Sequence, residues 1–217
     1  MLDIKEIILN ALSQIPWWFI PIIILIFIYK TPWFKGKVGE FLVNKTSDLW
    51  LDKNIYTKIK DVTLKLKDDT TTQIDHLIIS KYGIFVIETK NYKGWIYGNE
   101  KQKEWTQVNF KQKHKFQNPL NQNYRHIKAL EEVLEVDVKK FISVIAFVGE
   151  SMFKTEMPKN VCKGNKYIDY IQSFDEEILN QTEIENIINK IETKRLKNGF
   201  KTDREHVKNL RENRVVR

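Results

Sequence analysis

The sequence predicts an α/β domain in which helices flank a mixed central sheet, preceded by one transmembrane helix. A long apolar stretch opens the chain, two β-rich runs follow one another at residues 73–80 and 83–90, and helical patterns lie on both sides of them. With 217 residues and 42% hydrophobic content, the chain can bury one substantial core. We therefore expect an anchor and linker at residues 1–36, a core domain at 37–150 and a helical extension with a basic tail at 151–217.

The N-terminal apolar stretch has the length of a membrane span. Residues 7–29 carry no charge, which is about the twenty residues that a helix needs to cross a bilayer. An interfacial anchor needs a polar face, and a signal peptide begins with basic residues, whereas this chain begins LDIKE. A buried core helix is the remaining alternative. Because Lys30, Lys35 and Lys37 follow the span, we expect a single-pass protein of the cell membrane whose C-terminal domain faces the cytoplasm.

The secondary structure is predicted from hydrophobic spacing and from turn residues. Residues 38–49 have helical spacing, 55–66 alternate as one or two strands, and the two runs from Gln73 to Lys90 are the clearest strands. The stretch after Asn91 is typical of short antiparallel strands.

The second half of the chain alternates again between helix and strand. Asn118 and Pro119 have the pattern of an N-cap followed by proline at the first helical position, and a helix extends to about Leu134. The apolar run at 141–149 predicts a central strand covered on both faces. Capping-box spacings predict helices in the C-terminal third, at Ser173/Glu176, Thr182/Glu185 and Thr202/Glu205.

Three charged residues lie inside the two clearest strands. Strand alternation places Glu88 and Lys90 on one side of their strand. If Ser80 faces Gly83 in a two-residue turn, Asp75 falls opposite Glu88 and diagonal to Lys90. A four-residue turn or a bulge has the same parity, whereas a slip of one residue points Asp75 the other way.

Two carboxylates that face each other repel, so a cation is expected between them. Lys90 alone would make the cluster an ordinary salt bridge on the sheet. A divalent ion held by oxygen ligands is the alternative, and such an ion polarises phosphoryl oxygen and activates water.

The net charge of +8 is concentrated in two segments. Residues 101–115 hold five lysines against Glu104, and residues 194–217 hold nine Lys or Arg against three acids. Each segment is either a solvated face or a contact surface for phosphates or anionic lipid. The single cysteine, Cys162, excludes an internal disulfide, and the chain has no Walker-type loop, so we expect no nucleotide cofactor.

Several motifs, taken together, resemble the nuclease-related domain (NERD), a branch of the PD-D/E-x-K nuclease superfamily. They are GKVGE, QIDHLIIS, GIFVIETKNYKGWIYG, WTQ and FQNPLNQNYRHI, which together span roughly residues 37–134. The resemblance implies a restriction-endonuclease-like core and hydrolysis of DNA phosphodiester bonds with Mg²⁺ or Mn²⁺. The alternative is a nucleic-acid-binding or membrane-assembly module whose nuclease chemistry is weak or lost.

The resemblance also implies roles for individual residues. Asp75, Glu88 and Lys90 match the catalytic residues, and the metal ligands are Asp75, Glu88, the Thr89 carbonyl and Glu40. Supporting positions are Gln73, which has no derived role, and Gln122 and His126, which are similar to a Q-x-x-x-Y element with His in place of Tyr. Of the basic residues, Lys111, Lys113 and Lys115 are the candidates for contact with DNA phosphates.

Overall fold

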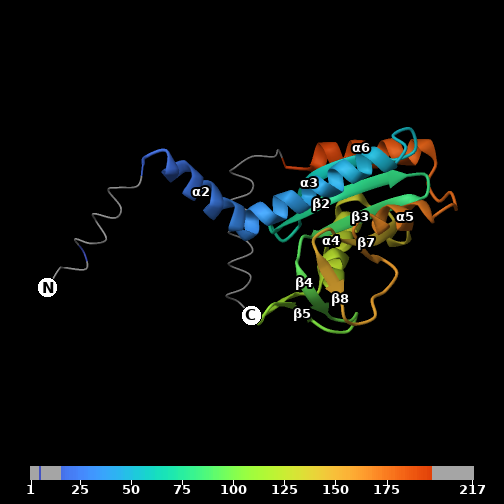
Figure 1. Cartoon of the computed structure of the whole chain (residues 1–217). Coiled ribbons are helices and arrows are strands. Elements are labelled where there is room, and N and C mark those ends of the chain that lie inside the picture. Colours follow the sequence, from blue (N-terminus) through green and yellow to red (C-terminus); the bar gives the residue numbers. More distant parts are fainter. Residues whose placement is uncertain (1–4, 6–15, 197–217) are drawn as a thin grey trace. The chain divides into compact units, whose positions relative to one another are not determined.

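The computed structural model of the chain describes Lys5 and residues 16–196 (Figure 1). The chain divides into two compact units, Met1–Val38 and Gly39–Arg217. Most of the predicted basic tail, residues 197–217, lies outside the described residues.

The first unit contains helix α2 (Phe19–Lys30), in which every residue is exposed. Residues 7–15 of the predicted span lie outside the described residues. In the described part of the chain, no single helix has both the length and the apolarity to cross a membrane. Helix α2 meets that test only together with α3 (Pro32–Trp50), and the two helices are bent by 70° at their junction.

Helix α3 begins six residues earlier than predicted. The Thr31 hydroxyl oxygen accepts a hydrogen bond from the backbone N–H of Phe34 at 3.2 Å, and Pro32 occupies the first position. This N-cap and proline pair starts the helix within the segment predicted as a linker. The helix then continues into the second unit.

The second unit is a mixed α/β fold built on two mixed sheets. Its elements are β1 (Thr57–Lys65), β2 (Thr71–Ser80), β3 (Gly83–Lys90), β4 (Gly94–Tyr97), β5 (Glu104–Asn109), β6 (Gln112–Gln117), α4 (Pro119–Leu134), the 3₁₀ turn η1 (Val138–Lys140), β7 (Phe141–Phe147), β8 (Ser151–Phe153), β9 (Val161–Lys163), α5 (Lys166–Gln172) and α6 (Gln181–Lys194). The strand orders are β1-β2-β3-β7-β9 and β6-β5-β4-β8.

The sequence predicts one sheet, and the second sheet is a correction. After Lys90 the chain turns at Gly94 (φ +83°), and β4 pairs in parallel with β8 instead of extending the first sheet. The three-residue strands β8 and β9 lie within residues 151–217, which the sequence predicts as a helical extension. Strands this short carry no readable alternation, so their pairing is set by tertiary contacts.

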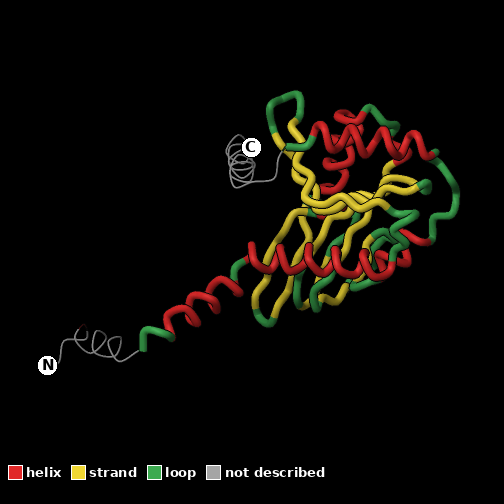
Figure 2. The backbone as a smooth tube through the Cα atoms, turned by 90° about the horizontal axis from the view of Figure 1, so that it is seen from above, coloured by secondary structure: helices red, strands yellow, loops and turns green. Residues whose placement is uncertain are grey.

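Helices cover both faces of the five-stranded sheet (Figure 2). Apolar residues of α4 and α6 pack on one face, with Ile84 and Val86 of β3, while α3 and α5 pack on the other, with Phe85 and Ile87. The predicted central strand is confirmed as β7, which lies between β3 and β9. Two C-terminal helices, α5 and α6, are present, but the predicted capping boxes are wrong in the described part of the chain. Ser173 is the C-cap of α5, and the capping box of α6 is formed by Asn180 and Glu183, two residues before the predicted pair. The third predicted pair, Thr202 and Glu205, lies outside the described residues.

Helix α4 is fixed to the sheet by buried asparagines. Asn118 caps it as predicted, accepting a hydrogen bond from the Leu120 N–H at 2.9 Å. One turn further along, the side-chain amide of Asn123 donates to the Val86 carbonyl at 2.8 Å and to the Ser143 hydroxyl at 2.9 Å. These bonds tie α4 to β3 and β7, so they set its depth and rotation over the sheet.

We expect Asn123→Ala to lower the free energy of unfolding by about 2 kcal/mol, because a buried hydrogen-bonding side chain is lost from the core. Urea denaturation followed by circular dichroism measures the effect. Asn121→Ala is the matched control, since Asn121 is an exposed asparagine on the same helix, and its change should stay within about 0.5 kcal/mol. Equal destabilisation by both variants would contradict the anchoring role of Asn123.

Candidate functional site

The turn between β2 and β3 sets which side chains meet. Ser80 pairs with Gly83, so the predicted two-residue turn is confirmed. Gly83 has φ +136°, and a Cβ there would lie 2.7 Å from the Ile142 side chain, so glycine is required. Continuing the register one pair beyond His76 and Ile87 brings Asp75 opposite Glu88.

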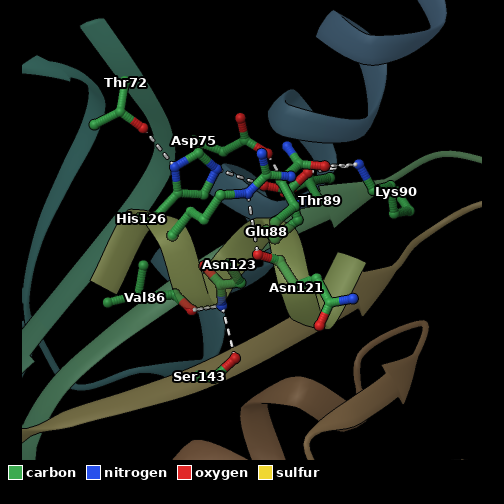
Figure 3. Close-up of polar contacts among 12 residues, drawn as sticks. Thr72, Asp75, Val86, Glu88, Thr89, Lys90, Asn121, Asn123, His126 and Ser143 are labelled. Atoms are coloured by element: carbon green, nitrogen blue, oxygen red, sulfur yellow. Dashed lines mark hydrogen bonds and ion pairs between the residues drawn. The ribbon is translucent and has the colours of Figure 1, made fainter. Parts of the chain in front are cut away.

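The three predicted catalytic residues are gathered at this end of the hairpin (Figure 3). An oxygen of Asp75 accepts a hydrogen bond from the Thr89 N–H at 2.9 Å. Glu88 is only 3% exposed, and its Oε1 accepts a hydrogen bond from Lys90 Nζ at 2.6 Å. The pair of acids and the ammonium therefore occupy one region of the sheet, as the register argument predicts.

Helix α4 brings its two predicted residues onto this cluster. The Gln122 side-chain oxygen accepts a hydrogen bond from Lys90 Nζ at 3.0 Å. One turn later, His126 Nε2 lies 3.2 Å from the second oxygen of Glu88, and its Nδ1 lies 2.7 Å from the Thr72 hydroxyl. Gln122 thus contacts the lysine, and His126 contacts the glutamate.

The pKa values of the two acids, Asp75 and Glu88, are shifted in opposite directions. Burial raises the pKa of Asp75 well above its usual range, and Glu88 and Glu40 raise it further against the opposing effect of the Thr89 N–H. Burial also acts to raise the pKa of Glu88, but Lys90 and His126 outweigh it and leave that pKa below its usual value. The pKa of Lys90 is raised despite burial, because Glu88 stabilises the ammonium.

The other predicted residues lie at different distances from this cluster. Glu40 follows Gly39, where α3 passes so close to β3 that a Cβ would meet Asn91 Cβ at 2.9 Å, and Glu40 is near enough to raise the pKa of Asp75. Gln73 lies two residues before Asp75 and pairs with Thr63. The candidates for DNA contact lie on the second sheet and take no part in the contacts described above. They are the exposed residues Lys111, in the turn between β5 and β6, and Lys113 and Lys115, on β6.

Sequence reasoning missed several residues of the site. Thr72 holds the His126 ring, and Asn123 holds the helix that carries it. Asp61 has φ +51°, and the register of β1 against β2 places it across from Asp75. An acid that interrupts the alternating run IYTKIKDVTL was the available signal for Asp61; Thr72 and Asn123 have no sequence signal of this kind.

The donor set suits a hard divalent cation. Carboxylate and carbonyl oxygens are the ligands that such ions prefer, and the pKa of Asp75 is raised first by burial and then by its acidic neighbours Glu88 and Glu40. Across Lys5 and residues 16–196, no group of three or more His, Cys, Asp or Glu side chains is already arranged to hold a metal. Both carboxylate oxygens of Glu88 are already in contact, one with Lys90 and the other with His126.

We expect Asp75→Asn to raise the melting temperature at neutral pH without added metal. A raised pKa in the folded state means that ionised Asp75 destabilises the fold. This penalty is absent below the ordinary aspartate pKa, grows as the pH rises, and is complete above the folded-state pKa. The stabilisation should therefore shrink on acidification. Calorimetry from pH 4 to 8 measures it, with the exposed Asp175→Asn as the control; a stabilisation that does not change with pH would contradict the assignment.

Comparison with known proteins agrees with these features. The model of a family described as nuclease-related domain matches residues 35–148. An uncharacterized protein of Bacillus anthracis is 41% identical over 164 residues, which cover 74% of this chain and 76% of the relative. No solved structure matches. The chain belongs to the nuclease-related domain (NERD) family.

Proposed function

We propose that this chain is a metal-dependent nuclease of the PD-D/E-x-K type that hydrolyses DNA phosphodiester bonds. The observation that carries the proposal is the buried Glu88–Lys90 ion pair with Asp75 opposite it on the neighbouring strand. A fold needs no such arrangement, since facing acids destabilise a sheet. Membership of a nuclease-related family supports the same chemistry.

Each residue has a role that follows from its contacts. Asp75, Glu88 and the Thr89 carbonyl would hold Mg²⁺ or Mn²⁺, assisted by Glu40. The bound ion would polarise the phosphate and acidify water. Lys90 acts as a cation, because its raised pKa keeps it protonated at neutral pH; it donates a hydrogen bond to the attacking water or to phosphate oxygen, and it is not the base.

Two residues of α4 position the charged groups. Gln122 accepts a hydrogen bond from Lys90 and so orients its ammonium group toward α4. His126 contacts Glu88, and a hydrogen bond with the Thr72 hydroxyl holds the His126 ring in place. His126 therefore stands where the Q-x-x-x-Y element of related exonucleases has tyrosine, and it contacts Glu88.

A binding module without strong nuclease chemistry is the second candidate. The observation that favours it is the same ion pair, since Lys90 already neutralises Glu88 without a metal. This candidate predicts salt-dependent DNA binding in the absence of metal-dependent cleavage.

For the nuclease, Lys90→Ala should lower the rate of DNA cleavage in Mg²⁺ or Mn²⁺ by at least about 100-fold, since a donor to the transition state is lost. The measurement is conversion of plasmid and linear DNA by the full chain in detergent, with EDTA as a blank. Lys93→Ala is the matched control, because Lys93 is an exposed lysine three residues further along, and it should cleave at the wild-type rate.

Metal binding is checked in the same preparations. Mn²⁺ should raise the melting temperature of the wild type but not that of Asp75→Asn, because a ligand that binds only the folded state stabilises it. Wild-type cleavage by Lys90→Ala would refute the nuclease assignment. If Lys90→Ala loses cleavage while Mn²⁺ still raises its melting temperature, Lys90 acts in the chemistry and not in metal binding. If Mn²⁺ no longer raises the melting temperature of Asp75→Asn, Asp75 is a metal ligand.

We also propose that the N-terminal segment anchors the protein in the cell membrane, with the second unit in the cytoplasm. The support is the uncharged stretch of residues 7–29 and the exposure of every residue of α2, which water would disfavour. The full chain should stay in the membrane pellet after alkaline carbonate extraction. Release into the supernatant would contradict the anchor, and a variant that starts at Lys37 provides the soluble reference.

A further inference from the structure

The outer face of the second sheet is exposed and carries aromatic side chains. Alternation along β4 and β5 turns Ile96 and Trp105 inward, where both are fully buried. The two neighbours of Ile96 on β4 face outward, so Trp95 is 48% exposed and Tyr97 is 36% exposed. Trp95 and Trp105 are thus separated by strand parity, and only Trp95 is available to a ligand.

Strand register arranges this face in two rows that each join an aromatic residue to a lysine. Opposite residues of an antiparallel pair project from the same face. The first row contains Trp95, Val108 and Lys113, and the second contains Tyr97, Thr106 and Lys115. With strands about 4.8 Å apart, each lysine starts about 10 Å from its aromatic partner, and its long side chain covers much of that gap.

The charge of the face is mainly positive. Lys154 lies over the Trp95 ring, with its Nζ 4.7 Å from the ring centroid. Lys111 stands at the adjoining turn and is exposed. Glu104 lies on this face, 3.8 Å from Lys115, and within residues 16–196 Lys113 and Lys154 form no ion pair with an acid. Such a surface complements a polyanion.

The second row opens into a polar cavity of 540 Å³. Tyr97, Thr106 and Lys115 contribute from the strands, and Asn99, Gln102 and Lys103 contribute from the β4–β5 loop. This volume is in the range of small-molecule sites. Its amide, hydroxyl and ammonium groups match the edges of a nucleobase and its phosphate, and the carboxylate of Glu104, which also lines the cavity, can accept a hydrogen bond from a base amino group. An acyl chain would find few apolar partners there.

We propose that this face binds single-stranded nucleic acid. Unpaired bases stack on Trp95 and Tyr97, which are two residues apart and so separated by about 7 Å along β4. Lys113, Lys115 and Lys154 contact the phosphates, and the cavity receives one base. The single strand is preferred because a duplex keeps its base faces stacked internally, where aromatic side chains do not reach them.

The proposed face is connected to the catalytic cluster through the chain. Strand β3 ends at Lys90 and β4 begins four residues later, while β6 ends at Gln117, just before α4. A single-stranded nucleic acid bound along the second sheet would therefore be held by β4 and β6, which directly follow β3 and precede α4 in the chain, the elements that carry catalytic-cluster residues. This inference rests on the proposed nuclease function and adds that the nucleic acid is single-stranded. It concerns binding alone, so its test does not depend on whether the protein cleaves DNA.

The test uses the full chain in detergent with EDTA, so that no cleavage takes place. Fluorescence anisotropy measures the affinity for a labelled dT₁₂ oligonucleotide and for a 12-base-pair duplex. Trp95→Ala should weaken dT₁₂ binding about tenfold, because one stacking partner is lost, and Trp95→Phe should restore most of the affinity. Lys113→Ala combined with Lys115→Ala should lower the slope of log affinity against log salt by about 1.4, at about 0.7 per phosphate contact on a single strand.

Trp50→Ala is the matched control, because Trp50 is a more exposed tryptophan on α3, outside this sheet. Its affinity for dT₁₂ should equal that of the wild type. Equal losses by Trp50→Ala and Trp95→Ala would overturn the proposal, as would an effect of Trp95→Ala on the duplex as large as that on dT₁₂. It would also be overturned if Trp95→Ala left dT₁₂ binding intact and removed binding of short-chain phosphatidylglycerol, which would assign the face to lipid headgroups.

Discussion

The candidate site depends on the register of β2 against β3. The turn of Lys81 and Tyr82 pairs Ser80 with Gly83, and the same alternation carries Asp75 to the position opposite Glu88. A slip of one residue would turn Asp75 toward the opposite face, which α3 and α5 cover, and would separate the two acids. The turn is itself fixed from outside, because Gly83 lies against the Ile142 side chain and the Lys140 carbonyl. The neighbouring strand therefore takes part in setting the geometry of the site.

The second constraint is the rotation of α4. Gln122 and His126 share one side of that helix, and their neighbour Asn123 binds the Val86 carbonyl and the Ser143 hydroxyl beneath them. A helix turned by one residue would rotate by about 100° and take both side chains off the cluster. The buried Glu88 then lacks the contact with His126 that helps to offset its desolvation. The position of α4 therefore affects the ionisation of Glu88, and the hydrogen bonds of Asn123 fix that position.

Local patterns predicted what local interactions determine. The Asn118 cap, the central strand β7 and the parity of the β2–β3 hairpin follow from spacing over a few residues, and each is confirmed. The second sheet does not follow, because β4 and β8 are too short to reveal a partner. Thr72 and Asn123 are ordinary polar residues until the chain brings them to His126 and Val86, 54 and 37 positions away. Among the site residues, Asp75, Glu88 and Lys90 were predictable from strand parity, and Gln122 and His126 from the family resemblance.

The two acids of the candidate site differ in how far the fold compensates their charge. Glu88 is compensated within the fold by Lys90 and His126, so its charge costs little, whereas Asp75 has one N–H donor and two acidic neighbours. A pair of carboxyl groups driven apart in this way performs two tasks. Glu88 holds the lysine and the helix in place, whereas burial and the acidic neighbours of Asp75 disfavour its ionised form. In the proposed metal site, a cation would therefore compete with the Lys90 ammonium for Glu88 and with a proton for Asp75.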